Sequence, residues 1–172
     1  MKTIQKYTVA FDGQLLRRGF WLYVWRIKSS KGLRLYVGRT GDSSSRYAAS
    51  PFHRIGQHLD ARPNAKGNAL MRQMLDDGLD PTRCKFELVA LGPLFPEQKS
   101  LASHRPIRDI VGGMEGALAT LFRERGYIVL GTHGKGTPPA PALMRKVRSV
   151  LAVAFPARLP RRHRPRSTMR PE

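Results

Sequence analysis

Residues 19–59 read GFWLYVWRIKSSKGLRLYVGRTGDSSSRYAASPFHRIGQHL, and this stretch decides the fold. Two segments rich in aromatic and β-branched residues, 20–27 and 33–37, flank a polar, glycine-containing turn at 28–32. This pattern predicts a β-hairpin. Gly38 follows the second segment, where a glycine lets the backbone leave a sheet sharply or approach a ligand closely. We therefore expect space beside the end of the second strand.

A helical pattern covers residues 51–60, in which apolar residues recur at helical spacing. Arg54 and His58 are four residues apart, so they project together from one flank of this helix. The hairpin contributes two phenols, Tyr23 and Tyr36. The sequence thus predicts that two phenols, a guanidinium and an imidazole meet in one cleft.

The formal net charge is +19, from 31 Lys and Arg residues against 12 Asp and Glu residues. Such an excess goes beyond what solubility requires and predicts a polyanionic partner, with nucleic acid as the first candidate. Composition alone leaves open a solvated basic surface or a packing role in a ribosome-type assembly. The length of 172 residues suits one domain with a real core.

Cys84 is the single cysteine, which excludes a disulfide or a zinc knuckle within one chain. We expect its side chain to fill space in the core. No apolar segment of the signal-peptide type follows the N-terminus, and no apolar run approaches the length of a membrane span. The expected location is a reducing cytoplasm without a membrane partner, and the sequence leaves the oligomeric state unknown.

Later elements follow from periodicity and turn residues. Helices are expected at 68–77 and 142–155 and within 103–125, where Gly112 and Gly113 favour a start after them; strands are expected at 85–91 and 127–130. Gly92 and Pro93 should end the strand at 85–91, because proline cannot donate to a sheet ladder. The element order predicts a small α/β domain of the α+β type, with a central three-stranded sheet flanked by helices.

The two half-motifs Trp21-Leu22-Tyr23 and Leu35-Tyr36-Val37-Gly38, followed by Arg39 and Thr40, resemble those of the GIY-YIG nuclease family. In the first half-motif Trp-Leu replaces Gly-Ile, while the tyrosine is retained. The resemblance covers residues 19–131 and implies that the hairpin and the third strand share one antiparallel sheet. Residues 1–18 are then an N-terminal arm or peripheral strand, 132–155 a loop and C-terminal helix, and 156–172 a disordered basic tail.

The resemblance implies a DNA endonuclease that hydrolyses phosphodiester bonds with Mg²⁺ or Mn²⁺. This chemistry needs an activated water and neutralisation of transition-state charge, which one metal ion and a few polar side chains supply. Arg54 corresponds to the arginine that holds the scissile phosphate, and His58 beside it resembles the restriction-enzyme branch. The resemblance further implies that Tyr23 positions or deprotonates the attacking water, with Tyr36 nearby as a contact to phosphate or water. Glu115 is the expected metal ligand and fifth catalytic residue.

Three other glutamates, Glu87, Glu97 and Glu124, are alternative metal ligands. Polar and basic residues outside the catalytic set are candidate contacts to nucleic acid: Arg39, Thr40, Arg46, Lys135, Arg145, Arg161 and Arg162. The sequence does not separate DNA from RNA. An asparagine that many family members carry after the next strand is absent, and Thr132 or His133 are its possible substitutes. The alternative function is therefore a catalytically weak nucleic-acid-binding module with the same fold.

Overall fold

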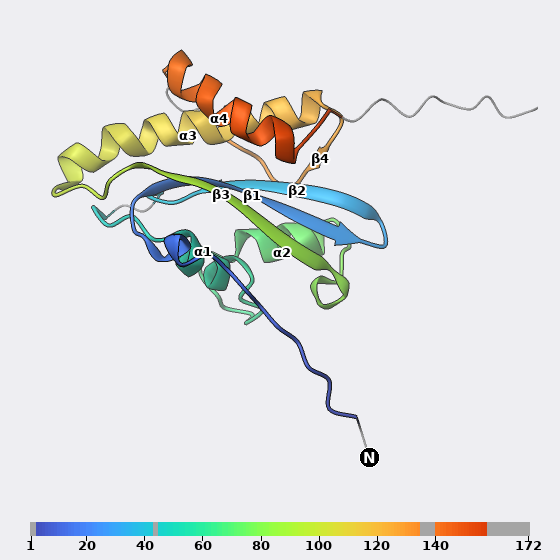
Figure 1. Ribbon diagram of the computed structural model, residues 1–172. Helices are drawn as coiled ribbons and strands as arrows, with labels where there is room; N and C mark the ends of the chain where they lie inside the picture. Colours follow the sequence, from blue (N-terminus) through green and yellow to red (C-terminus); the bar gives the residue numbers. More distant parts are fainter. Residues whose placement is uncertain (1–2, 43–44, 135–139, 158–172) are drawn as a thin grey trace, which may run out of the picture.

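A four-stranded sheet lies between two layers of helices (Figure 1). The structure is a computed structural model that describes residues 3–42, 45–134 and 140–157. The strand order is β3-β1-β2-β4, with β1 (Phe20–Ser29), β2 (Gly32–Arg39), β3 (Lys85–Phe95) and β4 (Ile128–Val129). The mixed α and β architecture agrees with the predicted class.

The predicted hairpin is confirmed: β1 and β2 pair antiparallel, and Ser29 lies opposite Gly32 at the turn. Gly32 has a φ of +95°, a conformation that favours glycine. β3 pairs antiparallel with the other side of β1. The prediction of a three-stranded sheet is wrong by one strand. The sheet has four strands, because β4 pairs parallel with Arg34 and Leu35 of β2. The rest of the outer edge of β2 is left for side chains to cover.

Two helices cover each face of the sheet (Figure 1). One face carries α1 (Pro51–His58) and α2 (Ala69–Asp76), and the other carries α3 (Leu101–Glu124) and α4 (Pro141–Ala154). Ser50 caps α1 by accepting a hydrogen bond from the His53 amide, and Pro51 occupies the first turn, where its missing N–H costs nothing. Short 3-10 helices, Gly13–Leu16 and Pro81–Arg83, precede β1 and β3.

Two sequence-based expectations about glycine and proline are wrong. α3 runs without interruption through Gly112 and Gly113. Gly113 is buried, and a Cβ on Gly112 would lie 3.3 Å from the Arg39 guanidinium carbon, so close packing accounts for these glycines. β3 continues through Pro93 to Phe95. Pro93 lies where the β1–β3 register shifts, between the Leu22–Leu91 and Phe20–Phe95 pairs, and proline is tolerated at such irregularities of an edge strand.

Alternation along the strands divides the buried residues into two clusters. On the face covered by α3 and α4, which we call the apolar face, Leu22, Val24 and Leu35 pack against helix residues such as Met114 and Phe122. On the opposite face, which we call the tyrosine face, the buried residues include Tyr23, Trp25, Ile27, Tyr36, Leu70 and Met74. Cys84 is only partly buried at the margin of this second cluster.

Residues 3–12 form an extended arm without strand pairing, rather than the alternative peripheral strand. Among the described residues, no helix has the length and apolar character needed to cross a membrane.

Candidate active site

The candidate site begins where β1 and β2 run side by side. Tyr23 of β1 lies opposite Gly38 of β2, and its ring extends across that glycine. A Cβ at position 38 would come within 2.4 Å of Tyr23 Cε2, so no other residue fits there without a shift. The Tyr23 hydroxyl lies 3.1 Å from the carbonyl oxygen of Arg39. The glycine of the second half-motif therefore makes room for the tyrosine of the first.

Tyr23 and His58 form a buried pair. Tyr23 Oη lies 2.6 Å from His58 Nε2, and the side chains are 1% and 0% exposed. Burial raises the pKa of Tyr23, an effect that nearby Arg54 partly offsets. Burial, followed by the charge of Arg54, lowers the pKa of His58 to about 3. Both groups are thus neutral at rest and are joined by a short hydrogen bond.

Arg54 covers this pair from α1. Its Nε lies 3.5 Å from Tyr23 Oη, and its Nη1 donates to Gln57 Oε1 at 2.9 Å. Its Nη2 donates to Asp42 Oδ2 at 2.8 Å, which forms an ion pair. Arg54 and His58 lie on one flank of α1, as their spacing predicted. Asp42 was missed by sequence reasoning, because a single aspartate in a polar loop carries no distinguishing signal.

Glu115 reaches the same region from α3. Its Oε2 accepts a hydrogen bond from Arg39 Nε at 2.9 Å, while Arg39 Nη1 donates to the carbonyl oxygen of Arg108 at 2.7 Å. Burial raises the pKa of Glu115 to about 7; Arg39 opposes this shift and Asp42 adds to it. Burial likewise raises the pKa of Tyr36 to about 12, with a further contribution from Glu115. These mutual effects place Glu115, Tyr36 and Asp42 within electrostatic range of one another.

His133 closes the outer edge of β2. Its Nε2 lies 3.0 Å from the carbonyl oxygen of Val37, beyond the point where β4 stops pairing. Because a carbonyl only accepts, Nε2 carries the hydrogen, and Nδ1 faces Arg123 Nη2 at 3.4 Å. The His133 ring also lies beside Tyr36, with 6.4 Å between ring centroids. Of the two possible substitutes for the absent asparagine, His133 lies beside a predicted site residue, whereas Thr132 is exposed.

The other glutamates lie in different surroundings. Glu87 pairs with Arg26 at 3.0 Å. Glu97 pairs with Arg18 at 2.8 Å and also accepts the amide of Ala48. Glu124 is exposed at the end of α3. Among the four candidate glutamates, Glu115 is the one that contacts Arg39 at the end of β2 and exchanges electrostatic effects with Tyr36 and Arg54.

The candidate nucleic-acid contacts are dispersed. Thr40 is fully buried, and its hydroxyl bonds within the hairpin to Gly19 O and the Trp21 amide. Arg46 is exposed and donates to Lys99 O and Tyr47 Oη. Arg145 is exposed on α4, which covers the apolar face. Lys135, Arg161, Arg162 and residues 158–172 of the expected tail lie outside the described residues.

His104 is a second residue that sequence reasoning missed. It is fully buried on α3, and its ring nitrogens lie 3.0 Å from the carbonyl oxygens of Arg46 and Gly41. Both partners are backbone carbonyl oxygens of the loop between β2 and α1. His104 therefore fastens the loop that carries Asp42 to α3.

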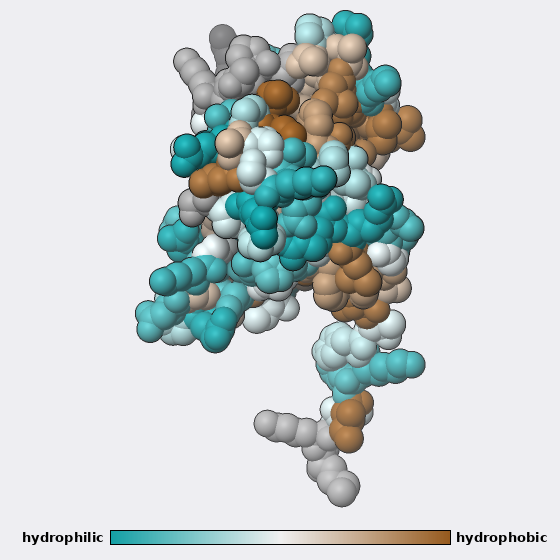
Figure 2. Space-filling model, turned by 90° about the vertical axis from the view of Figure 1, so that its left-hand side faces the viewer, coloured by the Kyte–Doolittle hydropathy of each residue, from teal (hydrophilic) through white to brown (hydrophobic). Residues whose placement is uncertain are grey.

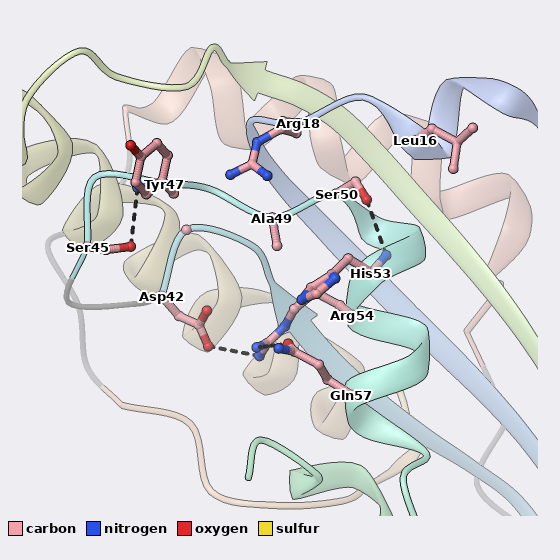
Figure 3. A pocket seen from close by; sticks show the side chains of 11 residues that line it. Leu16, Arg18, Asp42, Ser45, Tyr47, Ala49, Ser50, His53, Arg54 and Gln57 are labelled. Carbon is pink, nitrogen blue, oxygen red and sulfur yellow. Dashed lines mark hydrogen bonds and ion pairs between the residues drawn. The ribbon is translucent and has the colours of Figure 1, made fainter.

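A pocket of about 460 Å³ adjoins Arg54 (Figure 3). Arg18, His53 and Arg54 line it together with Asp42 and Tyr47, so its walls are largely polar. In Figure 3 the Arg54 side chain extends from α1 toward Asp42 across the pocket. The pocket thus gives solvent access to the side of the site where the guanidinium lies.

Comparisons with protein-family models, with curated proteins and with solved structures found no match to this chain. The site is therefore interpreted from its own residues.

Proposed function

We propose that this chain is a divalent-metal-dependent DNA endonuclease of the GIY-YIG type, which hydrolyses phosphodiester bonds. The observation that carries the proposal is the convergence of Tyr23, His58, Arg54 and Glu115, from three separate elements, around the end of the hairpin. A net charge of +19 favours a nucleic acid as the substrate.

Arg54 is suited to bind the scissile phosphate. A guanidinium matches two phosphate oxygens in a fork, and Arg54 borders a solvent-accessible pocket. Its present anionic partner is Asp42, at 2.8 Å. An incoming phosphate would take the place of that carboxylate, so substrate binding would separate Arg54 from Asp42 and uncover the Tyr23 hydroxyl beneath.

Tyr23 and His58 provide a route for a proton. A free phenol has a pKa of about 10, and burial raises that of Tyr23 further, so Tyr23 alone is a poor base at neutral pH. His58 Nε2, at 2.6 Å, is placed to accept the phenolic proton as Tyr23 accepts one from water, once an incoming phosphate offsets the Arg54 charge that helps to hold the pKa of His58 low. Arg54, adjacent to the hydroxyl, stabilises the negative charge that builds up on the phenolic oxygen while the two protons move.

The residues present also fit a hard divalent cation. Mg²⁺ is commonly held by one or two carboxylates, with waters and substrate phosphate completing the shell. Glu115 is a half-buried carboxylate, and burial raises its pKa by more than Arg39 lowers it, so a cation bound beside it would stabilise its charged form. The described residues hold no group of three or more His, Cys, Asp or Glu side chains, so Glu115 would be the main protein ligand. The bound ion would neutralise phosphate charge and acidify a coordinated water.

One observation favours the second candidate function, a catalytically weak nucleic-acid-binding module. Tyr23 is 1% exposed, with Arg54, His58 and the Arg39 carbonyl oxygen around its hydroxyl, so it cannot touch a substrate in this arrangement.

A cleavage assay separates the two functions. The full chain is incubated with plasmid DNA and Mg²⁺ or EDTA, alongside Glu115→Gln and the control Glu124→Gln on the same helix. We expect metal-dependent nicking or linearisation that Glu115→Gln abolishes and Glu124→Gln retains. Tyr23→Phe should also abolish cleavage, whereas Tyr7→Phe on the exposed arm should not. Tight DNA binding without cleavage by the wild type would replace the nuclease with the binding module.

A further inference from the structure

The N-terminal arm, residues 3–12, has the side-chain pattern of a strand but no strand partner in its own chain. Tyr7, Val9 and Phe11 alternate with smaller or polar residues, which is typical of a half-buried strand. Yet Tyr7 is 84% exposed and Val9 is 87% exposed. Figure 2 shows the arm standing clear of the body with apolar side chains in solvent. Exposed apolar side chains in a strand-like pattern indicate that the arm packs against a surface outside its own position in this structure.

β3 offers such a surface, because it is an edge strand of the sheet. Its inner side pairs with β1 from Phe20 opposite Phe95 to Lys28 opposite Lys85. Among the described residues, no backbone hydrogen bond outside the sheet involves residues 85–95. Every second residue of an edge strand turns its N–H and C=O outward, so β3 presents a row of unpaired groups.

The outer part of β3 is also apolar. Phe86, Leu88 and Ala90 pack at the margin of the tyrosine face and are only partly buried. A strand added beside them would continue that face and cover these side chains. The ten residues of the arm and the eleven residues of β3 have similar lengths at ~3.3 Å per residue. Pro93 cannot donate, which confines pairing to the part of β3 before it.

The charges within these two segments do not oppose a contact between them. The chain carries a net +19, which opposes association of two copies. The arm, however, has one Lys (Lys6) and one Asp (Asp12), and β3 has Lys85 and Glu87. The net charge of each segment is therefore zero. These are two neutral, largely apolar stretches in a strongly basic protein.

The arm leaves the body in a direction that takes it away from the β3 of its own chain. Phe11 is held against Phe52 of α1, with 4.4 Å between ring centroids. From Phe11 toward the N-terminus, the arm projects outward below the layer of α1 and α2 (Figure 1). A second copy can meet the projecting arm without any change at Phe11.

We propose that the N-terminal arm of one copy adds as a strand to the open edge of β3 in a second copy, and that reciprocal exchange gives a homodimer. This inference is independent of nuclease activity. The pairing satisfies outward backbone groups of β3 and buries apolar side chains on both segments.

Sedimentation and hydrogen exchange of the full chain test this inference. Both are measured over a concentration series in about 1 M salt, where a Debye length of ~3 Å screens the net charge. The test variant is Val9→Asp on the arm, and the control is Val153→Asp on α4, because the two valines are 87% and 89% exposed. We expect a dimer, with protection of β3 amides that increases with protein concentration. The dissociation constant of the dimer should be at least ~10-fold higher for Val9→Asp and unchanged for Val153→Asp.

Three results would overturn the inference. If the wild type stays monomeric at every concentration, the arm does not bind a second copy of this chain. A dimer that Val9→Asp leaves intact is held by another surface. Protection of β3 in a monomer, independent of concentration, means that the arm docks within its own chain. Because no substrate is used, none of these results depends on whether the protein cleaves DNA.

Discussion

The two faces of the sheet differ in whether their buried polar side-chain atoms have hydrogen-bond partners. Among the described residues, three buried side-chain atoms have no hydrogen-bond partner: Trp25 Nε1, His58 Nδ1 and Gln73 Oε1. Trp25 and His58 belong to the tyrosine face, and Gln73 lies on α2, which covers that face. The cluster on the apolar face contains a single side-chain hydroxyl, that of Tyr127, and it donates to Pro156 O at 2.7 Å.

This difference indicates that one face mainly stabilises the fold and that the other holds the candidate site. An unsatisfied buried polar atom costs ~1–3 kcal/mol, and a domain of this size has only ~5–15 kcal/mol of net stability. The apolar face, packed with aliphatic and aromatic side chains, stabilises the fold. The tyrosine face forgoes part of that stability and holds a phenol, an imidazole and a guanidinium in contact. We interpret the cost as the consequence of a functional site.

The largest expected effect comes from making the tyrosine face apolar. In Tyr23→Phe with His58→Leu, both members of the 2.6 Å hydrogen bond are removed together, along with the orphan His58 Nδ1. We expect the free energy of unfolding of the double variant to lie within ~1–2 kcal/mol of the wild-type value, because the groups that lose the Tyr23 hydroxyl, the Arg39 carbonyl oxygen and Arg54 Nε, are only partly buried. Cleavage should fall by ~10²–10⁴-fold, the usual contribution of a general base. Chemical denaturation and a plasmid assay measure the two effects.

The matched control lies on the apolar face. Phe122 is fully buried and contacts Tyr127 and Phe155, with ring centroids 5.9 and 5.0 Å away. Phe122→Ala should lose ~3–5 kcal/mol of stability, while the protein that remains folded still cleaves. If the double variant instead loses as much stability as Phe122→Ala, the division between the two faces is wrong.

A smaller effect concerns pH, through Glu115 at the junction of the two faces. Its pKa of about 7 means that the carboxylate forms only as the pH rises through 7. Metal binding requires that carboxylate, so cleavage at limiting Mg²⁺ should rise ~10-fold per pH unit below 7 and then level off. A pH profile of initial rates at low and saturating Mg²⁺ measures this, and a flat profile at low Mg²⁺ contradicts it.

Stability should change in the opposite direction. The folded protein binds the Glu115 proton more tightly than the unfolded chain does, since its pKa rises from 4.5 to about 7. The free energy of unfolding should therefore fall as the pH increases across that window, by at most ~3 kcal/mol at 1.36 kcal/mol per pKa unit. Glu115→Gln removes this slope, whereas Glu124→Gln preserves it.

The sequence predicted the parts of the molecule that depend on local pattern. The hairpin, α1 and the shared flank of Arg54 and His58 follow from strand and helix periodicity, which short-range sequence contains. The length of β3 was underestimated, because Pro93 is harmless on an edge strand and edge position is a property of the whole sheet. Thr40 was expected at a nucleic-acid surface, yet its hydroxyl bonds inside the hairpin, a contact across 21 residues.

The same reasoning explains which site residues were missed. Asp42 pairs with Arg54 across 12 positions, and His104 bonds to Gly41 across 63. Neither residue belongs to a spaced motif, so nothing in the local sequence indicates its partner. Glu115 was identified only through the family resemblance, and its contact with Arg39 spans 76 positions.

The smallest expected effect comes from Asp42, which in the proposed function would compete with phosphate for Arg54. Asp42→Asn keeps the side-chain size but removes the negative charge paired with Arg54. Because the Asp42 side chain is 37% exposed, solvent screening limits the pair to ~0–1 kcal/mol, so DNA affinity should increase no more than ~5-fold. Asp60→Asn is the control, since Asp60 pairs with the exposed Arg62 outside the site. Fluorescence anisotropy in EDTA measures binding without cleavage. Weaker binding by Asp42→Asn would show that Asp42 orients Arg54 for the phosphate rather than competing with it, and the ion pair would then belong to the working site.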